Sequence, residues 1–254
     1  MSELSITDRG PVRIVLIDGE ARMNVLSRAL VAELAAESKR AGGDSAIRAM
    51  VITGSGTRAF CAGANLKERR GWTDDDIRRW LVELHTALRE IERCPKPWIA
   101  AVNGLALGGG CELALACDIV LAAEHASFGL PEASVGLVPG FGILRAPSVV
   151  GRQATKLMVL AGERLGAQRA CELGLVQQVL PAAELLPAAL KLGERIAERA
   201  PLAVEVGKRM VNRGVDRGET GYGVEAVAML YATRDAAEGI AAFTERREPR
   251  FEGR

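Results

Sequence analysis

The chain has 254 residues, of which 48% are hydrophobic, enough to bury the core of a single α/β unit. Its 33 Lys and Arg residues nearly balance 32 Asp and Glu residues, so the basic excess typical of nucleic-acid binders is missing. No apolar run approaches the roughly 20 residues that span a bilayer, and the opening MSELSITDRGP lacks the apolar core of a signal peptide. We therefore expect a cytoplasmic protein that binds neither nucleic acid nor a membrane.

The five cysteines are scattered through apolar sequence, and no two have the spacing of a zinc site, so we expect reduced thiols and no metal. The two histidines, His85 and His125, lie far apart, and neither is next to a nucleophile or a metal-ligand partner. Both are expected to be surface or hydrogen-bonded polar side chains, and the chemistry is expected to proceed without histidine.

The hydrophobic pattern of the first two thirds predicts strands alternating with helices, without a fixed repeat. Strands are predicted over 12–18, 48–53, 98–102, 105–107 and 118–123. Helices are predicted over 27–39, from 73 to the break at 94–97, and over 111–116. After residue 151 the pattern changes to helix, over 152–161, 167–173, 183–199, 203–213 and most of 219–245. We expect this helical third to pack on the core or on a neighbouring subunit.

Three consecutive glycines, Gly108 to Gly110, stand between a predicted strand and a predicted helix. Glycine runs cost conformational entropy, and they suit places where the backbone must approach another group closely. Amides at a helix N-terminus have no partner within the helix, and one such donor to a developing oxyanion contributes about 3 kcal/mol. For the glycine run alone, a tight turn with close strand–helix packing is the simpler explanation.

Two further features favour a catalytic site. A second turn of small residues, within 60–67, follows a strand and can supply another amide. Two glutamates also follow the glycines: Glu112 at the start of the helix, and Glu132 in the segment Leu130-Pro131-Glu132. Each has a plain alternative, because the helix dipole favours an acid at the position of Glu112 and Glu132 fits a surface loop.

Three blocks in the order AFCAGANLKE, AAVNGLALGGGCELALACD and FGLPEASVGLVPG resemble the signatures of the crotonase (enoyl-CoA hydratase/isomerase) superfamily. The resemblance runs from IDGEARMNVLS to AFTERREPRFEGR, almost the length of the chain. It implies an α/β, ClpP-like fold with a β-β-α spiral core over 1–198 and two near-perpendicular sheets. It also implies a C-terminal helical segment over 199–254 that drives homotrimers, often paired as hexamers.

The resemblance also implies roles for individual residues. In the family two backbone amides hold the thioester oxygen of an acyl-CoA, and the matching positions are Ala64 and Gly109. Its hydratases use two glutamates to handle one water, matching Glu112 and Glu132, and an amide at the position of Gly140 helps to hold that water. The implied activity is an acyl-CoA hydratase or dehydratase, a lyase of fatty acid metabolism without metal or redox cofactor.

Coenzyme A needs cationic contacts for its phosphates. Arg22 and Lys67 are candidates, with Ala62 in the same turn as Lys67, and the tail contributes Phe243 and Arg246 by resemblance to the family's closing motif. Arg246 stands where the family usually has lysine. Solvated surface charge is the alternative for all of these cations.

The run from Pro139 to Pro147 departs from the family pattern PGxGGTQRLP. It is one residue shorter, it lacks the Thr-Gln pair, and Phe141 replaces a small residue. We expect Phe141 and Leu130 to line the acyl pocket, and the acyl group is left open. The alternatives are another reaction of the superfamily (an isomerase, a CoA hydrolase or a C–C hydrolase) or, in a different class, a non-catalytic RNA-binding protein.

Overall fold

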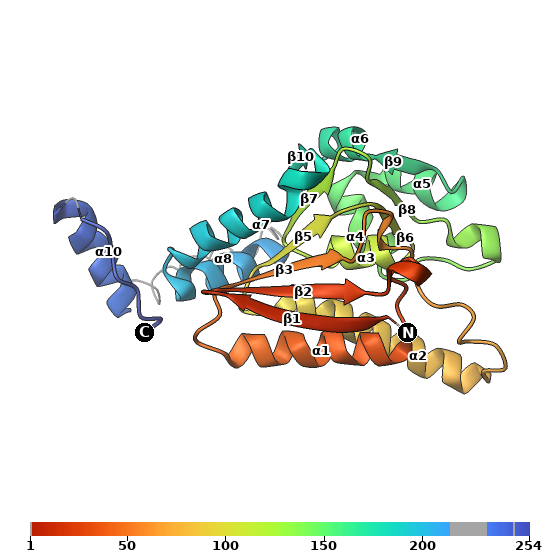
Figure 1. The fold of residues 1–254 in the computed structure, drawn as a ribbon, viewed down its shortest axis with the longest axis horizontal. Helices are drawn as coiled ribbons and strands as arrows, with labels where there is room; N and C mark the ends of the chain where they lie inside the picture. Colours follow the sequence, from red (N-terminus) through yellow and green to blue (C-terminus); the bar gives the residue numbers. More distant parts are fainter. Residues whose placement is uncertain (1, 214–232, 246) are drawn as a thin grey trace.

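The computed structural model describes residues 2–213, 233–245 and 247–254, and within them it shows two β-sheets surrounded by helices (Figure 1). The larger sheet has the strand order β1-β2-β3-β5-β7-β10, and the smaller sheet has the order β4-β6-β8-β9. The strands are β1 (Glu3–Arg9), β2 (Val12–Asp18), β3 (Ala49–Gly54), β4 (Ala59–Cys61), β5 (Trp98–Val102), β6 (Leu105–Leu107), β7 (Ile119–Ala123), β8 (Ser127–Gly129), β9 (Arg164–Gly166) and β10 (Gln178–Leu180).

Helices cover both sheets. They are α1 (Arg28–Gly43), α2 (Asp74–Arg93), α3 (Gly109–Ala116), α4 (Gly142–Val149), α5 (Arg152–Leu160), α6 (Ala167–Glu172), α7 (Ala182–Ala197), α8 (Pro201–Arg213) and α10 (Arg234–Glu245), with 3-10 helices η1 (Glu20–Arg22) and η2 (Glu132–Val135). Helices α1 and α2 lie side by side below β1 to β3 in Figure 1, and α7 lies across β3, β5 and β7. None of the helices in the described part of the chain is long and apolar enough to cross a membrane.

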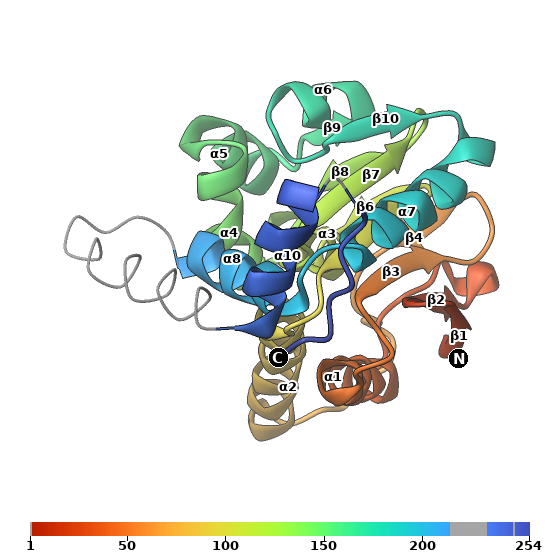
Figure 2. The same ribbon diagram turned by 90° about the vertical axis from the view of Figure 1, so that its left-hand side faces the viewer.

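The core repeats a strand–strand–helix unit, which confirms the spiral arrangement expected from the sequence. Strands β3, β5 and β7 run parallel in the larger sheet, and each is followed by a short strand of the smaller sheet: β4, β6 and β8. These three short strands are also mutually parallel neighbours, and they lie together with α3 in the interior (Figure 2). The carboxyl ends of β4, β6 and β8 therefore meet at one edge of the smaller sheet, where parallel sheets usually bind ligands.

Local sequence explains where the two long helices begin. The hydroxyl of Ser27 accepts a hydrogen bond from the amide of Leu30 and caps α1, as its position in the sequence predicts. Thr73 and Asp76 form a reciprocal capping box at the start of α2, and the first turn also contains Asp74 and Asp75, whose charges suit a helix N-terminus. Trp80, Leu84 and Leu88 on the apolar face of α2 are buried in the core, with Trp80 only 1% exposed. Leu81, also expected on this face, is 44% exposed.

The expectation of an all-helical C-terminal third is wrong. Strand β9 pairs antiparallel with β8, and β10 pairs parallel with β7, so this part of the chain supplies an outer strand to each sheet. Each strand has three residues, which is too short for a period of two to stand out in the sequence. Their pairing partners lie far away along the chain, and only the tertiary structure brings them together.

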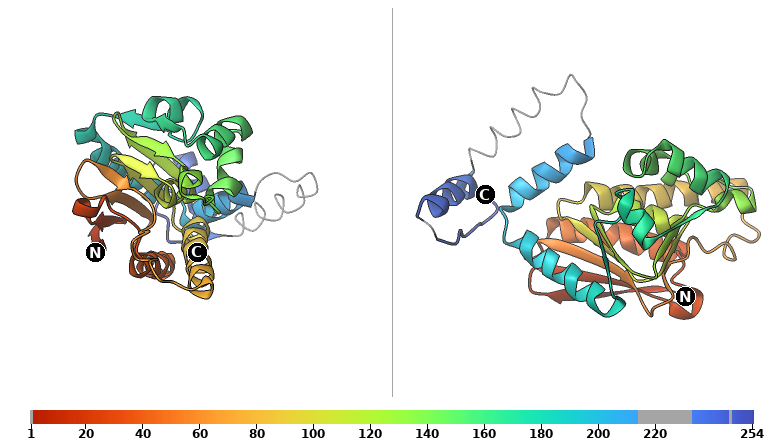
Figure 3. Two further views of the ribbon diagram at one scale, coloured as in Figure 1. Left: turned by 90° about the vertical axis from the view of Figure 1, so that its right-hand side faces the viewer. Right: turned by 90° about the horizontal axis from the view of Figure 1, so that it is seen from above.

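Helix α10 stands apart from the two sheets (Figure 3). The tail after it turns back: the buried carboxylate of Asp235 accepts hydrogen bonds from the amides of Glu252 and Gly253, 2.6 and 2.8 Å long. A Cβ added to Gly253 would lie 3.2 Å from Pro201, at the start of α8. The chain end is thus folded against the first residues of the expected C-terminal helical segment.

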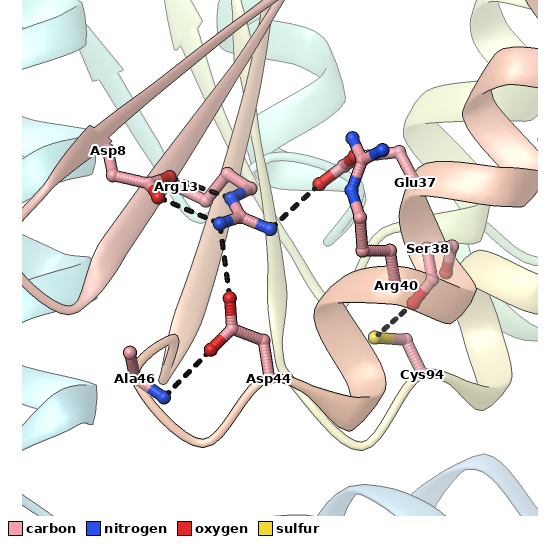
Figure 4. Close-up of polar contacts among 8 residues, drawn as sticks. All are labelled: Asp8, Arg13, Glu37, Ser38, Arg40, Asp44, Ala46 and Cys94. Atoms are coloured by element: carbon pink, nitrogen blue, oxygen red, sulfur yellow. Dashed lines mark hydrogen bonds and ion pairs between the residues drawn. The ribbon is translucent and has the colours of Figure 1, made fainter.

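A buried arginine ties the β1–β2 hairpin to α1 (Figure 4). The guanidinium of Arg13, on β2, donates two hydrogen bonds of 2.7 Å to Asp8 and one of 3.1 Å to Glu37 on α1. A further bond of 3.2 Å reaches Asp44 at the end of α1. Glu37 is 2% exposed and also pairs with Arg40, so its charge is removed from water and depends on these cations.

Replacing Arg13 with alanine should lower the free energy of unfolding by about 3 kcal/mol, because it leaves the Glu37 carboxylate buried with a weaker set of partners. Urea unfolding followed by circular dichroism measures the change. Arg9→Ala is the matched control, since Arg9 is exposed on the same hairpin. An equal, small change in both variants would show that the cluster contributes little to stability.

Candidate active site

Three turns meet beyond the carboxyl ends of β4, β6 and β8. The turn after β4 contains Ala64, the turn after β6 is the glycine run, and the segment after β8 contains Glu132. The strand order β4-β6-β8 puts the glycine run in the middle, with the other two turns on either side. The structure thus brings together four residues that the sequence singled out: Ala64, Gly109, Glu112 and Glu132.

The first and third glycines of the run are required for different reasons. Gly108 has φ of +52°, a value that favours glycine, and an added Cβ there would lie 2.6 Å from Glu132 Oε1. An added Cβ at Gly110 would lie 1.9 Å from the carbonyl oxygen of Cys61, so α3 can approach β4 only without a side chain. Close packing of strand and helix therefore does explain Gly110. At Gly108 the missing side chain lets the Glu132 carboxyl group approach the backbone.

Two backbone N–H groups lie close together at this edge. The amide nitrogen of Ala64 is 3.6 Å from the position that a Cβ of Gly109 would take. Among the described residues neither the N–H of Ala64 nor that of Gly109 has a hydrogen-bond acceptor. Gly109 begins α3, so its free N–H is one of the donors that every helix start leaves available. Two such donors side by side can bind one oxygen atom and stabilise negative charge on it.

The first carboxylate of the site is held by amides. Glu112 is 3% exposed, within a helix whose eight residues are all buried. Its Oε1 accepts hydrogen bonds of 2.9 Å from the amides of Phe141 and Gly142, at the start of α4. Its Oε2 lies 3.9 Å from the position of an added Cβ on Gly109. Burial raises the pKa of Glu112, and the two amides oppose that rise by stabilising the charged form.

The second carboxyl group lacks such support. Glu132 begins the short helix η2, and its buried Oε2 has no hydrogen-bond partner in the described part of the chain. Burial, aided by the negative charge of Glu112, raises the pKa of Glu132 to about 7. Two carboxyl groups in one site with opposite support are suited to opposite roles in proton transfer, one as a base and the other as an acid.

Phe141 and Leu130, the expected acyl-pocket residues, are both buried, at 2% and 0% exposed. The ring of Phe141 lies edge-on to His85 at 6.3 Å and below the guanidinium of Arg145 at 5.0 Å. Arg145 is in turn fixed by Glu92 through bonds of 2.5 and 2.9 Å. The altered loop is thus braced against α2.

Sequence reasoning missed the position of His85. A Cβ added to Gly140 would lie 2.7 Å from Nε2 of His85. His85 is therefore beside the turn whose amides hold Glu112. His125 does fit the expectation, since its Nε2 is 3.0 Å from the carbonyl oxygen of Thr57. The helical spacing of α2 could have indicated that His85 faces inward with Leu84 and Leu88, but not what it faces.

The candidate contacts to coenzyme A divide into two groups. Arg22 and Lys67 are exposed. The amide of Ala62 donates a 3.0 Å hydrogen bond to the carbonyl oxygen of Met23, which holds the turn after β2 against the turn after β4. Phe243 belongs to α10, and Arg246 lies outside the described residues, so their roles stay predictions from the sequence. Buried Asn24, next to Met23, fixes the turn after β2 by donating a 2.7 Å hydrogen bond to the carbonyl oxygen of Ala59.

Comparison with known proteins identifies the family. A family model described as enoyl-CoA hydratase/isomerase matches residues 10–254. The chain belongs to this family. It is 39% identical to 2,3-dehydroadipyl-CoA hydratase of Escherichia coli (strain K12) over 100% of both chains. It is 36% identical to crotonyl-CoA hydratase of Syntrophomonas wolfei, over 94% of this chain and 93% of that one.

Solved structures agree. The crystal structure of an enoyl-CoA hydratase from Bacillus anthracis superimposes with a TM-score of 0.95 and 37% sequence identity, covering 99% of each chain. The fold expected from the resemblance, the crotonase fold, is thereby confirmed, and the chain is an enoyl-CoA hydratase-like enzyme, a hydro-lyase by class.

Glu132→Gln should stabilise the enzyme above pH 7. The pKa of Glu132 rises from 4.5 to about 7 on folding, so ionisation destabilises the folded state as the pH increases through this window. Glutamine cannot ionise, and the variant should gain on the order of 2 kcal/mol at pH 8 and nothing near pH 4.5. Thermal unfolding at both pH values tests this, with Glu124→Gln, an exposed glutamate, as the control. A gain that does not depend on pH would contradict it.

Proposed function

We propose that this enzyme adds water across the double bond of a 2-enoyl-CoA thioester, or removes it from the corresponding 3-hydroxyacyl-CoA, using Glu112 and Glu132. One observation carries the proposal: a carboxylate held by two amides and a carboxyl group with a pKa of about 7 flank two free N–H groups. Conjugate addition of water needs a base, an acid and a donor pair for the thioester oxygen, and these groups supply all three.

The proposed hydration starts with the thioester oxygen accepting hydrogen bonds from the amides of Ala64 and Gly109. Ionised Glu112 takes a proton from the water, whose oxygen forms a bond to Cβ while the π electrons move toward the thioester oxygen. The resulting enolate-like charge is stabilised by the two amides. Protonated Glu132 then gives its proton to Cα. Dehydration is the reverse, and the amide of Gly140 is proposed to help hold the water.

Binding of the coenzyme A part is proposed for Arg22, Ala62 and Lys67, with Phe243 and Arg246 from the C-terminal segment. The exposed cations suit phosphate groups. The proposed scheme needs no cofactor besides the coenzyme A of the substrate, because side chains and amides supply every proton transfer and charge contact. A cytoplasmic location also stays part of this proposal.

The acyl group is left open by the relatives. Crotonyl-CoA hydratase is named for a neutral acyl chain, whereas 2,3-dehydroadipyl-CoA hydratase is named for a chain with a second carboxyl group. Both are hydratases, so the reaction class is common to them while the far end of the acyl chain differs.

Glu112→Gln and Glu132→Gln should each lower kcat by at least about 100-fold, since each removes a proton-transfer group. The loss of the conjugated-thioester absorbance of crotonyl-CoA and longer enoyl-CoAs measures turnover. Binding of coenzyme A should change little. Unchanged turnover in both variants would contradict the two-glutamate scheme. Isomerisation, thioester hydrolysis or C–C cleavage by the wild type, without hydration, would favour another reaction of the family.

We also propose that the chain forms homotrimers or hexamers, with residues 199–254 as the oligomerisation segment. Large apolar side chains are exposed on the stretch from η2 through α5, as a covered surface requires. They are Val135, Leu137, Val138, Ile143, Leu144, Val149, Leu157 and Leu160. Light scattering after gel filtration should give three or six times the 27.0 kDa mass of one chain. A monomer at micromolar concentration would contradict this proposal.

A further inference from the structure

Arg69 differs from the other arginines that lie against the core. Arg13, Arg28 and Arg145 each hold a carboxylate within 3.2 Å. Arg69 is half-buried, yet no described carboxylate lies within ion-pair distance of it, and its buried Nε has no hydrogen-bond partner. Leaving a buried donor unpaired costs about 1–3 kcal/mol, so an unpaired guanidinium in this position calls for an explanation.

The guanidinium of Arg69 lies over a buried aromatic wall. Its Cζ is 5.2 Å from the ring centre of Trp80, which is 1% exposed, and Trp72 lies edge-on to the same ring at 6.1 Å. This stacking fixes the plane of the guanidinium but uses none of its N–H groups. Burial lowers the pKa of Arg69, while the charges of Glu68 and Glu112 act against that change. Among the described residues, Arg69 therefore keeps its side-chain donors without a partner.

His85 faces the same carboxylate from α2. Burial raises the pKa of Glu112 and the charge of Arg69 acts against that rise, although among the described residues neither Arg69 nor His85 donates a hydrogen bond to it. His85 lies on the side of Glu112 where Oε1 meets the amides of Phe141 and Gly142. Gly109 lies near the other oxygen, with Oε2 of Glu112 3.9 Å from the position of an added Cβ on Gly109. His85 and Gly109 thus lie beside different oxygens of the carboxylate that is proposed to act on the substrate.

We propose that the acyl group of the substrate ends in a carboxylate, and that Arg69 and His85 bind it. This inference rests on the proposed function, because it takes the thioester to lie at Ala64 and Gly109. A planar guanidinium with free N–H groups matches a carboxylate, and an imidazole N–H adds a donor from the neighbouring helix. An alkyl chain in the same place would leave the cation unpaired against methyl groups. The substrate class is a dicarboxylic 2-enoyl-CoA.

A pair of substrates that differ only at the far end tests the proposal: hex-2-enedioyl-CoA and hex-2-enoyl-CoA. The wild type should prefer the diacid by roughly 10- to 100-fold in kcat/KM, the value of a charge-assisted contact. Arg69→Met should abolish the preference while keeping activity on hex-2-enoyl-CoA, and His85→Gln should reduce it. The matched control is Arg70→Met, since Arg70 is the exposed neighbour and should keep the preference.

The outcomes separate the two proposals. If neither thioester is hydrated, the proposed function fails, and affinities for the saturated analogues adipyl-CoA and hexanoyl-CoA still test the carboxylate site. Equal affinity for those two analogues, or equal kcat/KM for the two enoyl-CoAs, overturns the carboxylate site alone. An equal loss on both substrates in Arg69→Met, with an unchanged ratio, also overturns it, because Arg69 would then serve coenzyme A binding or folding. A circular-dichroism melt establishes that each variant folds.

Discussion

The site depends on the parallel pairing of three short strands. Because β4, β6 and β8 run in the same direction as neighbours, the turns that follow them must emerge at one edge of the smaller sheet. This places Ala64, the glycine run and Glu132 within reach of one another, although they lie far apart along the chain. The close fit of Gly110 to the carbonyl oxygen of Cys61 keeps α3 against β4, and so keeps the N–H of Gly109 beside that of Ala64. A slip of this pairing would separate the two donors.

Unequal support for two carboxyl groups follows from the same arrangement. Helix α3 carries Glu112 into the interior, where the start of α4 meets it with two amides that favour the charged form. Glu132 lies at the start of η2 against Gly108, where no donor from the described residues reaches its buried Oε2. The difference arises from backbone positions rather than from the identity of the side chains, which are the same. Burial raises the pKa of both groups, so neither carboxylate adds to the stability of the folded state at neutral pH. The difference between them suits the pair to accept a proton at one group and donate one from the other.

Cations near the site extend this electrostatic logic. Arg145 is paired with Glu92 and braces Phe141, whereas Arg69 lies over Trp80 with no partner for its donors among the described residues. The Arg145–Glu92 pair stabilises the protein, whereas the unpaired guanidinium of Arg69 can bind an anionic group of a ligand. A substrate carboxylate is the group that would complete it, and the far end of the acyl chain is where substrates of related hydratases differ.

The sequence by itself determined much of this protein: the strands and helices with a clear period, the caps at Ser27 and Thr73, the glycine turn, the two glutamates and, through three motif blocks, the family. These features are local, and short stretches of residues are enough to specify them. The tertiary structure alone decided the rest. Strands β9 and β10 exist because partners distant in the chain pair with them. The position of His85 beside Gly140, the lone guanidinium of Arg69 and the raised pKa of Glu132 all depend on burial and on charges brought together by folding, which no local pattern encodes.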